Sequence, residues 1–325
     1  AMSANQLQIL RGDEVPIDGL MGKRISIIGY GNQGRVHAQN LRDSGLDVSV
    51  YARNPESAIE DGFDPISIED ASTCDLVIIA LPDEVQGEVF AKQIEPNLHL
   101  GTVLGFIHGF SVHYGHINPP TGTGIVMVAP KGPGVAVRAK FLNGSGIPAL
   151  LAVEKENESN TARSIALGWA AGIGSGRVGV FVSTFADETE TDLFGEQAVI
   201  VGGLAALVKA SYETLVEAGY PPQLAYIECC HEVKQVADIL QEKGMSDMMA
   251  SISNTAEMGA YVAMDLLDDE HLRNHLRTLL QDVRDGSFAK RLVDRTIKSK
   301  QEELRNHEID QVGKEIRSLM RPDTD

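Results

Sequence analysis

The chain has 325 residues, of which 43% are hydrophobic and 23% charged, a balance typical of a globular protein long enough for two domains. Its formal net charge of -18 argues against nucleic acid or an anionic membrane as the main partner, because both select basic surfaces. The three cysteines lack metal-binding spacing, and there is no signal-peptide pattern and no run of about eighteen apolar residues. These features predict a cytoplasmic protein without a disulfide framework or a membrane span.

The first element with a chemical signature is a glycine-rich turn after a short apolar run. Residues 24–28 (RISII) are typical of a buried strand, and a helical pattern over residues 35–45 follows the turn. In this context the glycines allow a tight turn and let a pyrophosphate approach the start of the helix. We therefore predict dinucleotide binding here, rather than a tight turn without a ligand. The residues of the motif GYGNQG are Gly29, Tyr30, Gly31, Asn32, Gln33 and Gly34.

The second predicted strand, residues 47–52, leads into a loop that would meet the adenosine ribose of the cofactor. An acidic residue in such a loop favours the 2′-hydroxyl of NAD, whereas arginine and hydroxyl groups favour the 2′-phosphate of NADP. The loop carries both kinds, since Arg53 and Ser57 suit a phosphate while Glu56 would repel one. A solvated loop carboxylate is the alternative for Glu56, so the residues alone leave the cofactor open.

A third buried strand is predicted within residues 75–86 (DLVIIALPDEVQ). We expect it to run into a loop that covers the cofactor and contains Asp83 and Gln86. Residues 146–152 are typical of a further strand, and residues 161–174 of a helix that ends at glycines.

The strands between these carry a polar residue at each carboxyl end. Residues 102–110 end in the sequence HGF with His108, and residues 124–134 place Lys131 just past their strand. Ligands of open α/β sheets bind outside the carboxyl ends of the strands, which makes His108 and Lys131 candidate site residues. A structural role for a strand-end histidine is the alternative.

Strands and helices alternate up to about residue 183, and long helical patterns follow. This order predicts an α/β protein with a Rossmann-type doubly wound sheet, followed by an all-α domain. We place the dinucleotide-binding domain at residues 1–183 and the helical domain at residues 184–325.

The helical part holds two pairs of carboxylates, each one turn apart: Asp192 with Glu196, and Glu228 with Glu232. Side chains at i and i+4 share a helix face, where like charges repel. Apolar residues continue both rows, so we expect the acids to face protein at least in part. Buried carboxylates are costly unless they are paired or coordinated, and Mg²⁺ prefers oxygen ligands. The spacing therefore allows a metal site, with a solvated acidic face as the alternative.

Other polar residues of this region have simpler interpretations. Asp187, Glu188 and Glu190 lie near a helix start, where acids complement the helix dipole. Residues 251–259 (SISNTAEMG) form a hydroxyl-rich break between helices, and helix capping is the first interpretation of Ser253.

Taken together, these motifs resemble the ketol-acid reductoisomerases, in the short form with one helical domain per chain. The resemblance covers residues 22–262 and again 307–320 (HEIDQVGKEIRSLM). The matching text includes GYGNQG, LPDEVQ, HGF, MVAPKGPG, DETETDLFGEQAV, LVEAGYPPQLAYIECCHEVK and SISNTAE.

The resemblance implies a knotted helical domain that interleaves with a second subunit, and hence a homodimer at least, with a dodecamer as the larger alternative. It implies two Mg²⁺ ions held by Asp192 and Glu196 of one chain, with Glu228 and Glu232 from the partner. The implied substrates are 2-acetolactate and 2-aceto-2-hydroxybutyrate. Alkyl migration and reduction by NAD(P)H would give the 2,3-dihydroxy acid, on the way to valine, isoleucine and leucine.

The resemblance also implies roles for individual side chains. Ser253 would hold the substrate carboxylate, and His108 and Lys131 would lie beside the reacting centre. Glu232 would also assist proton transfer, because a carboxylate near the substrate can serve as acid or base.

The chain departs from the family pattern at the cofactor loop. Many members have an arginine followed by two serines here, whereas this chain has Glu56 three residues after Arg53. A carboxylate close to a phosphate dianion is unfavourable by about 1 kcal/mol or more even in a wet site. We therefore predict NADH preference or dual use over strict NADPH use.

Two other classes remain as alternatives. A nicotinamide dehydrogenase of the 6-phosphogluconate or hydroxyisobutyrate type would share the order of domains but would not need the carboxylate pairs. A redox-sensing protein would hold a dinucleotide without turnover. Mg²⁺-dependent activity separates the predicted enzyme from both.

Overall fold

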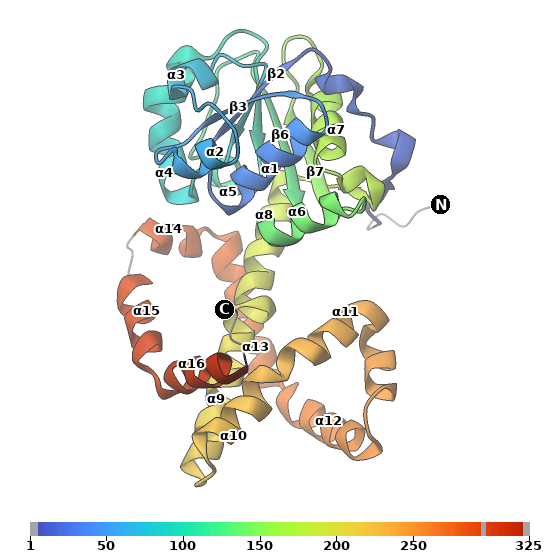
Figure 1. The fold of residues 1–325 in the computed structure, drawn as a ribbon, viewed down its shortest axis with the longest axis vertical. Coiled ribbons are helices and arrows are strands. Elements are labelled where there is room, and N and C mark those ends of the chain that lie inside the picture. Colours follow the sequence, from blue (N-terminus) through green and yellow to red (C-terminus); the bar gives the residue numbers. More distant parts are fainter. Residues whose placement is uncertain (1–5, 294–296, 321–325) are drawn as a thin grey trace. The chain divides into compact units, whose positions relative to one another are not determined.

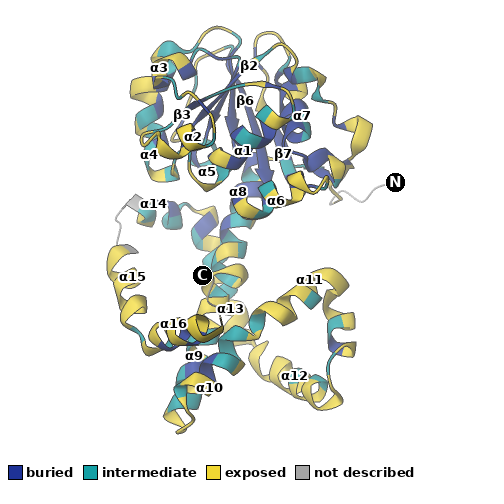
Figure 2. Cartoon of the chain, viewed as in Figure 1, coloured by how far each residue is buried: buried dark blue, intermediate teal, exposed yellow. Residues whose placement is uncertain are grey.

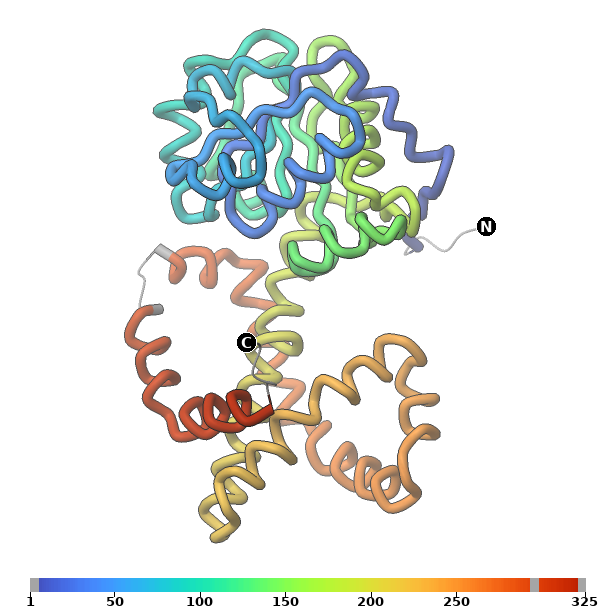
Figure 3. The backbone as a smooth tube through the Cα atoms, in the orientation of Figure 1, coloured from blue at the N-terminus to red at the C-terminus, as the bar shows by residue number. Residues whose placement is uncertain are grey.

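The structure is a computed structural model that describes residues 6–293 and 297–320. The chain divides into two compact units, Ala1–Thr191 and Asp192–Asp325 (Figures 1 and 3). The predicted boundary after residue 183 lies between the last strand and the helix that enters the second unit. The outer ends of the two predicted domains, residues 1 and 325, lie outside the described residues.

The first unit is built on one mixed sheet with the strand order β1-β8-β7-β6-β5-β4-β2-β3. The strands from β3 to β6 are parallel neighbours, whereas β6 with β7 and β1 with β8 are antiparallel pairs. The chain runs from β2 outward to β3 and then back past β2 to β4, so the ligand crevice of such a sheet is expected where β2 and β4 meet. The strands are β1 (Gln8–Leu10), β2 (Arg24–Ile28), β3 (Asp47–Tyr51), β4 (Leu76–Ile79), β5 (Val103–Phe106), β6 (Gly124–Pro130), β7 (Ala149–Lys155) and β8 (Val180–Val182).

Apolar cores cover both faces of this sheet, which explains why its central strands are continuous apolar runs. Successive strand residues point to opposite faces, so Ile27 belongs to one core and Ile28 to the other. The first core includes the fully buried Trp169, and the second includes Phe90 and Phe185. Figure 2 shows the strands as the most buried part of the unit.

The helices after the glycine-rich turn and at residues 162–172 were predicted, whereas two predicted loops are helical. Glu56 and Ser57 begin a short helix at residues 56–60, after Pro55, so the predicted loop is wrong there. Asp83 and Gln86 lie on a helix, so the predicted loop is wrong there. Pro82 precedes the helix and acidic residues fill its first turn, and both favour helix initiation. The helices are α1 (Asn32–Asp43), α2 (Glu56–Glu60), α3 (Ile68–Ala71), α4 (Asp83–Val89), α5 (Phe110–His113), α6 (Gly134–Leu142) and α7 (Ala162–Gly172).

In the second unit every regular element among the described residues is helical. Its helices are α8 to α16, of which α8 begins in the first unit. Figure 3 shows them in colours from yellow-green to red. Two π-helical segments, Glu196–Ile200 and Ile227–His231, interrupt the α-helices. The helices are α8 (Phe185–Gly195), α9 (Gly202–Glu217), α10 (Pro222–Tyr226), α11 (Val233–Ala250), α12 (Asn254–Leu267), α13 (Glu270–Arg284), α14 (Ser287–Val293), α15 (Ile297–Asn306) and α16 (Glu308–Met320).

The core of the second unit is small. It is formed by Tyr212, Ala225, Tyr226, Val312 and Ile316, from α9, α10 and α16. Most of α11, α12 and α15 is exposed (Figure 2).

One helical stretch, Phe185–Glu217, is long and apolar enough to cross a membrane by length and composition, with a mean hydropathy of 1.5 over its best window. This is weak evidence for a membrane span, because helices that pack against other protein have the same composition.

Candidate active site

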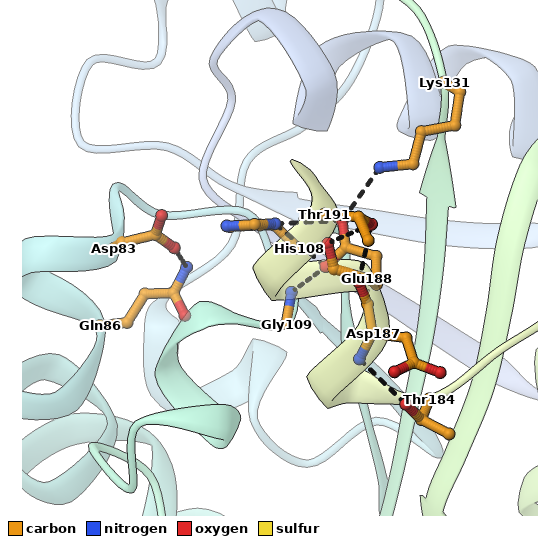
Figure 4. A network of polar contacts seen from close by, with 9 residues as sticks. All are labelled: Asp83, Gln86, His108, Gly109, Lys131, Thr184, Asp187, Glu188 and Thr191. Carbon is orange, nitrogen blue, oxygen red and sulfur yellow. Dashed lines mark hydrogen bonds and ion pairs between the residues drawn. The ribbon is translucent and has the colours of Figure 1, made fainter. Parts of the chain in front are cut away.

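A buried carboxylate, Glu188 on α8, joins the residues predicted at the ends of two strands (Figure 4). His108 Nδ1 lies 3.1 Å from each carboxylate oxygen of Glu188, and its N–H is the donor because a carboxylate only accepts. Lys131 Nζ donates to Oε1 at 3.1 Å, and the backbone N–H of Gly109 donates to Oε2 at 2.9 Å. The structure therefore brings His108 and Lys131 together through Glu188, which was not among the predicted site residues.

The fold positions each member of this cluster. His108 lies just past β5 and Lys131 just past β6, and these neighbouring parallel strands end at the same sheet edge. At the start of α8, Phe185 packs edge-on against Phe106 of β5 with ring centroids 6.1 Å apart. Thr184 caps α8 by accepting from the backbone N–H of Asp187 at 3.0 Å. Glu188 is thus fixed on the first turn of a capped and anchored helix.

The surroundings of Glu188 keep it ionised although its side chain is only 1% exposed. Burial raises the pKa of Glu188, but the hydrogen bond and charge of His108, the charge of Lys131 and the N–H of Gly109 outweigh it, so the pKa lies below its usual value. Glu188 lies in the first turn of α8, as predicted, but its burial and its three donors give it a role beyond the helix dipole. A signal was present in the sequence, because Glu188, Asp192 and Glu196 continue one i, i+4 row.

Asp192 lies one turn after Glu188 on α8. One ligand atom each from His108, Glu188 and Asp192 lies within 4.8 Å of the other two. Asp192 and Glu196 continue the row of Glu188 along this helix and its π-helical extension, which makes them candidates for metal ligands. A set of carboxylate oxygens fits a hard cation such as Mg²⁺.

The four predicted metal ligands differ in exposure. Asp192 is half-buried, whereas Glu196, Glu228 and Glu232 are exposed, so the expectation that these rows face protein is not met by this chain alone. Glu196 begins one π-helical segment and Glu228 lies in the other. Among the described residues, the group of His108, Glu188 and Asp192 includes none of Glu196, Glu228 and Glu232.

The glycine-rich turn has the form that a dinucleotide requires. Gly29 has φ +109, and a Cβ there would lie 2.6 Å from the carbonyl oxygen of Ala80. A Cβ on Gly34 would lie 2.0 Å from the carbonyl oxygen of Gly29. At Gly31, by contrast, a Cβ would meet no atom within 4 Å, so the backbone is open on that side. Two glycines serve packing and the third leaves room for a close ligand, which fits a pyrophosphate.

The other predicted cofactor residues lie around this turn or on α2 and α4. Tyr30 donates to Asp61 at 2.8 Å, Gln33 donates to the carbonyl of Gly132 at 3.1 Å, and Asn32 is the exposed first residue of α1. Arg53, Glu56 and Ser57 are all exposed, as a loop that meets a ligand requires.

Gln86 is buried on α4. Its amide nitrogen donates to the carbonyl of Leu81 at 2.7 Å and to Asp83 at 3.3 Å. Its amide oxygen is buried without a hydrogen-bond partner among the described residues, so an acceptor remains for a ligand that carries a donor.

Ser253 is exposed and acts as the N-cap of α12, where its hydroxyl accepts from the backbone N–H of Ala256 at 3.2 Å. The capping interpretation therefore describes this chain, and a substrate contact stays a prediction.

Comparison with known proteins follows the same division of the chain. Residues 19–179 match the NADPH-binding domain of acetohydroxy acid isomeroreductases, and residues 185–322 match the C-terminal domain of ketol-acid reductoisomerases. Among solved structures, the chain is similar to an NADH-preferring ketol-acid reductoisomerase from an uncultured archean, with 38% identity over 97% of this chain and 100% of that chain and a TM-score of 0.93. A semialdehyde dehydrogenase NAD-binding protein from Cupriavidus necator matches with 18% identity over 82% of this chain and 99% of that chain, at a TM-score of 0.60, and so shares the fold alone. The chain belongs to the ketol-acid reductoisomerase family.

Proposed function

We propose that this NAD(P)H-dependent ketol-acid reductoisomerase works with two Mg²⁺ ions, prefers NADH and completes each active site with a second copy of the chain. The enzyme acts on acetolactate-type substrates in branched-chain amino-acid biosynthesis. The observation that carries the proposal is the cluster in which Glu188 binds both His108 and Lys131. Glu188 lies one helical turn before Asp192, which belongs to the same group of potential ligands.

The metal proposal assigns Asp192 and Glu196 of one chain, and Glu228 and Glu232 of the second copy, as the ligands. Bound Mg²⁺ would acidify the substrate hydroxyl and polarise its ketone, which alkyl migration requires. The oxygen-rich donor set and the place of Asp192 beside His108 and Glu188 support this assignment.

The protein groups next to this centre orient the substrate and move protons. Because His108 donates from Nδ1 to Glu188, its Nε2 is the acceptor in the neutral imidazole. Lys131 presents an ammonium with three donors and gives one of them to Glu188. We assign Glu232 as the acid or base for the substrate and Ser253 as a contact of its carboxylate.

The cofactor proposal rests on Glu56. It is the exposed first residue of α2, in the loop that leaves β3 toward the expected position of the ribose. A carboxylate there accepts from a ribose hydroxyl and repels a 2′-phosphate. The similar archaeal enzyme is NADH-preferring, which supports the same choice, whereas the matching domain family is described as NADPH-binding.

The test of this choice is Mg²⁺-dependent oxidation of NADH and of NADPH with 2-acetolactate, on the parent and on Glu56→Ser. We expect the parent to favour NADH and the variant to shift toward NADPH. Glu60→Ser, at the other end of α2, is the matched control and should leave the ratio unchanged. A parent that favours NADPH would refute the role of Glu56 and leave the enzyme assignment intact.

Exposed apolar side chains support the second copy. Val199, Ile200 and Val201, beside Glu196, are 63%, 64% and 62% exposed. Val262 and Leu266 on α12 are 59% and 75% exposed. A run of exposed apolar side chains such as residues 199–201 is typical of an interaction surface. We propose that a second copy of the chain covers these side chains.

We further propose that residues 1–183 and 184–325 are the functional domains. The enzyme works in the cytoplasm, where its free cysteines stay reduced.

Subunit complementation tests the shared site directly. Asp192→Asn and Glu228→Gln should each abolish turnover. In a refolded equal mixture, half of the dimers are mixed and each mixed dimer has one intact site, so about a quarter of the parent activity should return. No recovery, with dimers demonstrated by light scattering, would mean that all four carboxylates come from one chain. The same light-scattering measurement separates a dimer from a dodecamer.

A further inference from the structure

A second polar cluster in the first unit surrounds Asp61, the residue that follows α2. Its carboxylate accepts from Tyr30 at 2.8 Å and from two nitrogens of Arg35 at 2.6 and 2.8 Å. The Asp61 side chain is 12% exposed and that of Arg35 is 46% exposed. A bidentate contact with arginine fixes both position and orientation, so Asp61 joins α2 to the glycine-rich turn and to the first turn of α1.

The backbone beside Asp61 is held as well. Arg42 of α1 donates to the carbonyl oxygen of Asp61 at 2.6 Å, and its guanidinium lies 4.3 Å from the ring centroid of Phe63. Phe63 also packs edge-on against Tyr30, with ring centroids 5.9 Å apart. Gly62, between Asp61 and Phe63 in the chain, has φ +82, a conformation that glycine adopts without strain. The chain after α2 is therefore fixed by Tyr30 of the glycine-rich turn and by Arg35 and Arg42 of α1.

The segment that precedes Asp61 runs from Arg53 through α2, and it carries Glu56 and Ser57 on the first turn of that helix. At its other end it leaves β3, which is paired along its length with β2. The three side chains themselves are exposed. The position of this segment therefore depends on the strand β3, on the buried Ala58 of α2 and on the contacts of Asp61.

We infer that Asp61 is a positioning residue for cofactor selection, which holds Glu56 where it discriminates against a 2′-phosphate and keeps Arg35 engaged. The inference rests on the proposed NADH preference. Depression of the pKa of Asp61, caused first by the hydrogen bond from Arg35, agrees with a carboxylate that stays ionised in this role.

The physical consequence is unequal for the two cofactors. If a binding-competent loop is populated in only about a tenth of the molecules, affinity falls about tenfold. NADH bears this loss in full. NADPH loses less, because a displaced Glu56 no longer repels the phosphate and Arg35, released from Asp61, can pair with it. Loss of the contact between Asp61 and Arg35 should thus weaken NADH binding and also lower the selectivity for NADH over NADPH.

The experiment measures the Kd of NADH and of NADPH by titration calorimetry on the full chain, for the parent, Asp61→Asn, Arg35→Gln and the double variant. We expect the Kd of NADH to rise about tenfold in each single variant and in the double variant alike, because both changes remove one contact. The Kd of NADPH should rise less, and least in Asp61→Asn, where Arg35 remains to pair with the phosphate. In turnover, KM for NADH should rise while kcat at saturating NADH stays within about twofold of the parent.

Asp268→Asn is the matched control, because Asp268 also pairs with an arginine, at 2.8 Å from Arg273, but lies in the second unit. It should change neither Kd. Equal weakening of both cofactors, no weakening, or additive effects in the double variant would each overturn the inference. Arg35→Gln keeps the test decisive if Asp61→Asn does not fold, since Arg35 is half-exposed. A parent that binds NADH but does not turn over 2-acetolactate would refute the proposed function and leave this binding test standing.

Discussion

Replacement of Glu188 by glutamine is the most direct test of the cluster that joins His108 and Lys131. Glutamine keeps the size of the side chain and an oxygen for the N–H of Gly109, but it removes the negative charge. Hydrogen bonds to charged groups contribute about 1.5–3 kcal/mol, and breaking a buried pair costs about 3–5 kcal/mol. Because Lys131 is 35% exposed and keeps part of its hydration, we take about 3 kcal/mol, near the lower limit.

If that energy is expressed in the reaction barrier, Glu188→Gln should lower kcat about 10²-fold, since about 1.4 kcal/mol corresponds to tenfold. The KM for NADH should not change, because no residue of the glycine-rich turn contacts Glu188. The assay is Mg²⁺-dependent NADH oxidation with 2-acetolactate. A 2-keto-3-hydroxy acid supplied directly bypasses alkyl migration and shows which of the two steps is slowed.

Glu190→Gln is the matched control on the same helix. Glu190 lies 3.5 Å from His113 and outside the cluster, so its loss should leave kcat within about twofold of the parent, as for most changes away from reacting groups. A Glu188→Gln enzyme with near-parent kcat would refute the argument that this carboxylate organises the site. Equal losses in both variants would assign the effect to α8 as a whole.

Two further outcomes follow from other contacts. Removal of divalent cations with a chelator should abolish turnover but preserve NADH binding in calorimetry, and added Mg²⁺ should restore activity; turnover without metal would refute the carboxylate assignment. Burial lowers the pKa of His37 to about 3, so its stabilising contribution is complete above about pH 6.5 and is lost as the pH falls toward 3. At pH 5.5 the loss should be about 1.4 kcal/mol in denaturant unfolding, and His37→Gln should remove this part of the pH dependence.

The central part of the sheet was predictable from sequence because its strands are apolar runs bounded by turns. The outer strands β1 and β8 were not predicted. Each has three residues, which is too short for a periodicity, and they exist because they pair with each other and because β8 pairs with β7. The helix α4 was expected as a loop because its position next to the cofactor suggested a cover, although the proline and acids at its start favour a helix.

The candidate site was predictable where the residue type itself indicates chemistry, as with His108 and Lys131. It was not predictable where the role depends on contacts between distant parts of the chain. Glu188 looks like any acid in a first helical turn until β5 and β6 bring two nitrogen donors to it. Asp61 likewise shows no motif, and its partners Tyr30 and Arg35 are 31 and 26 residues away in sequence.

The carboxylates of this protein avoid the cost of burying a charge in two different ways. Glu188 is buried within one chain, so it needs partners within that chain, and two side chains and a backbone N–H supply them. Glu196, Glu228 and Glu232 remain exposed in the single chain, so water can solvate them at little cost. Covering them without cations would cost several kcal/mol for each charge. Assembly of the second copy and metal binding should therefore be coupled, and Mg²⁺ should shift a dilute sample toward the dimer in sedimentation, an effect that Asp192→Asn should weaken.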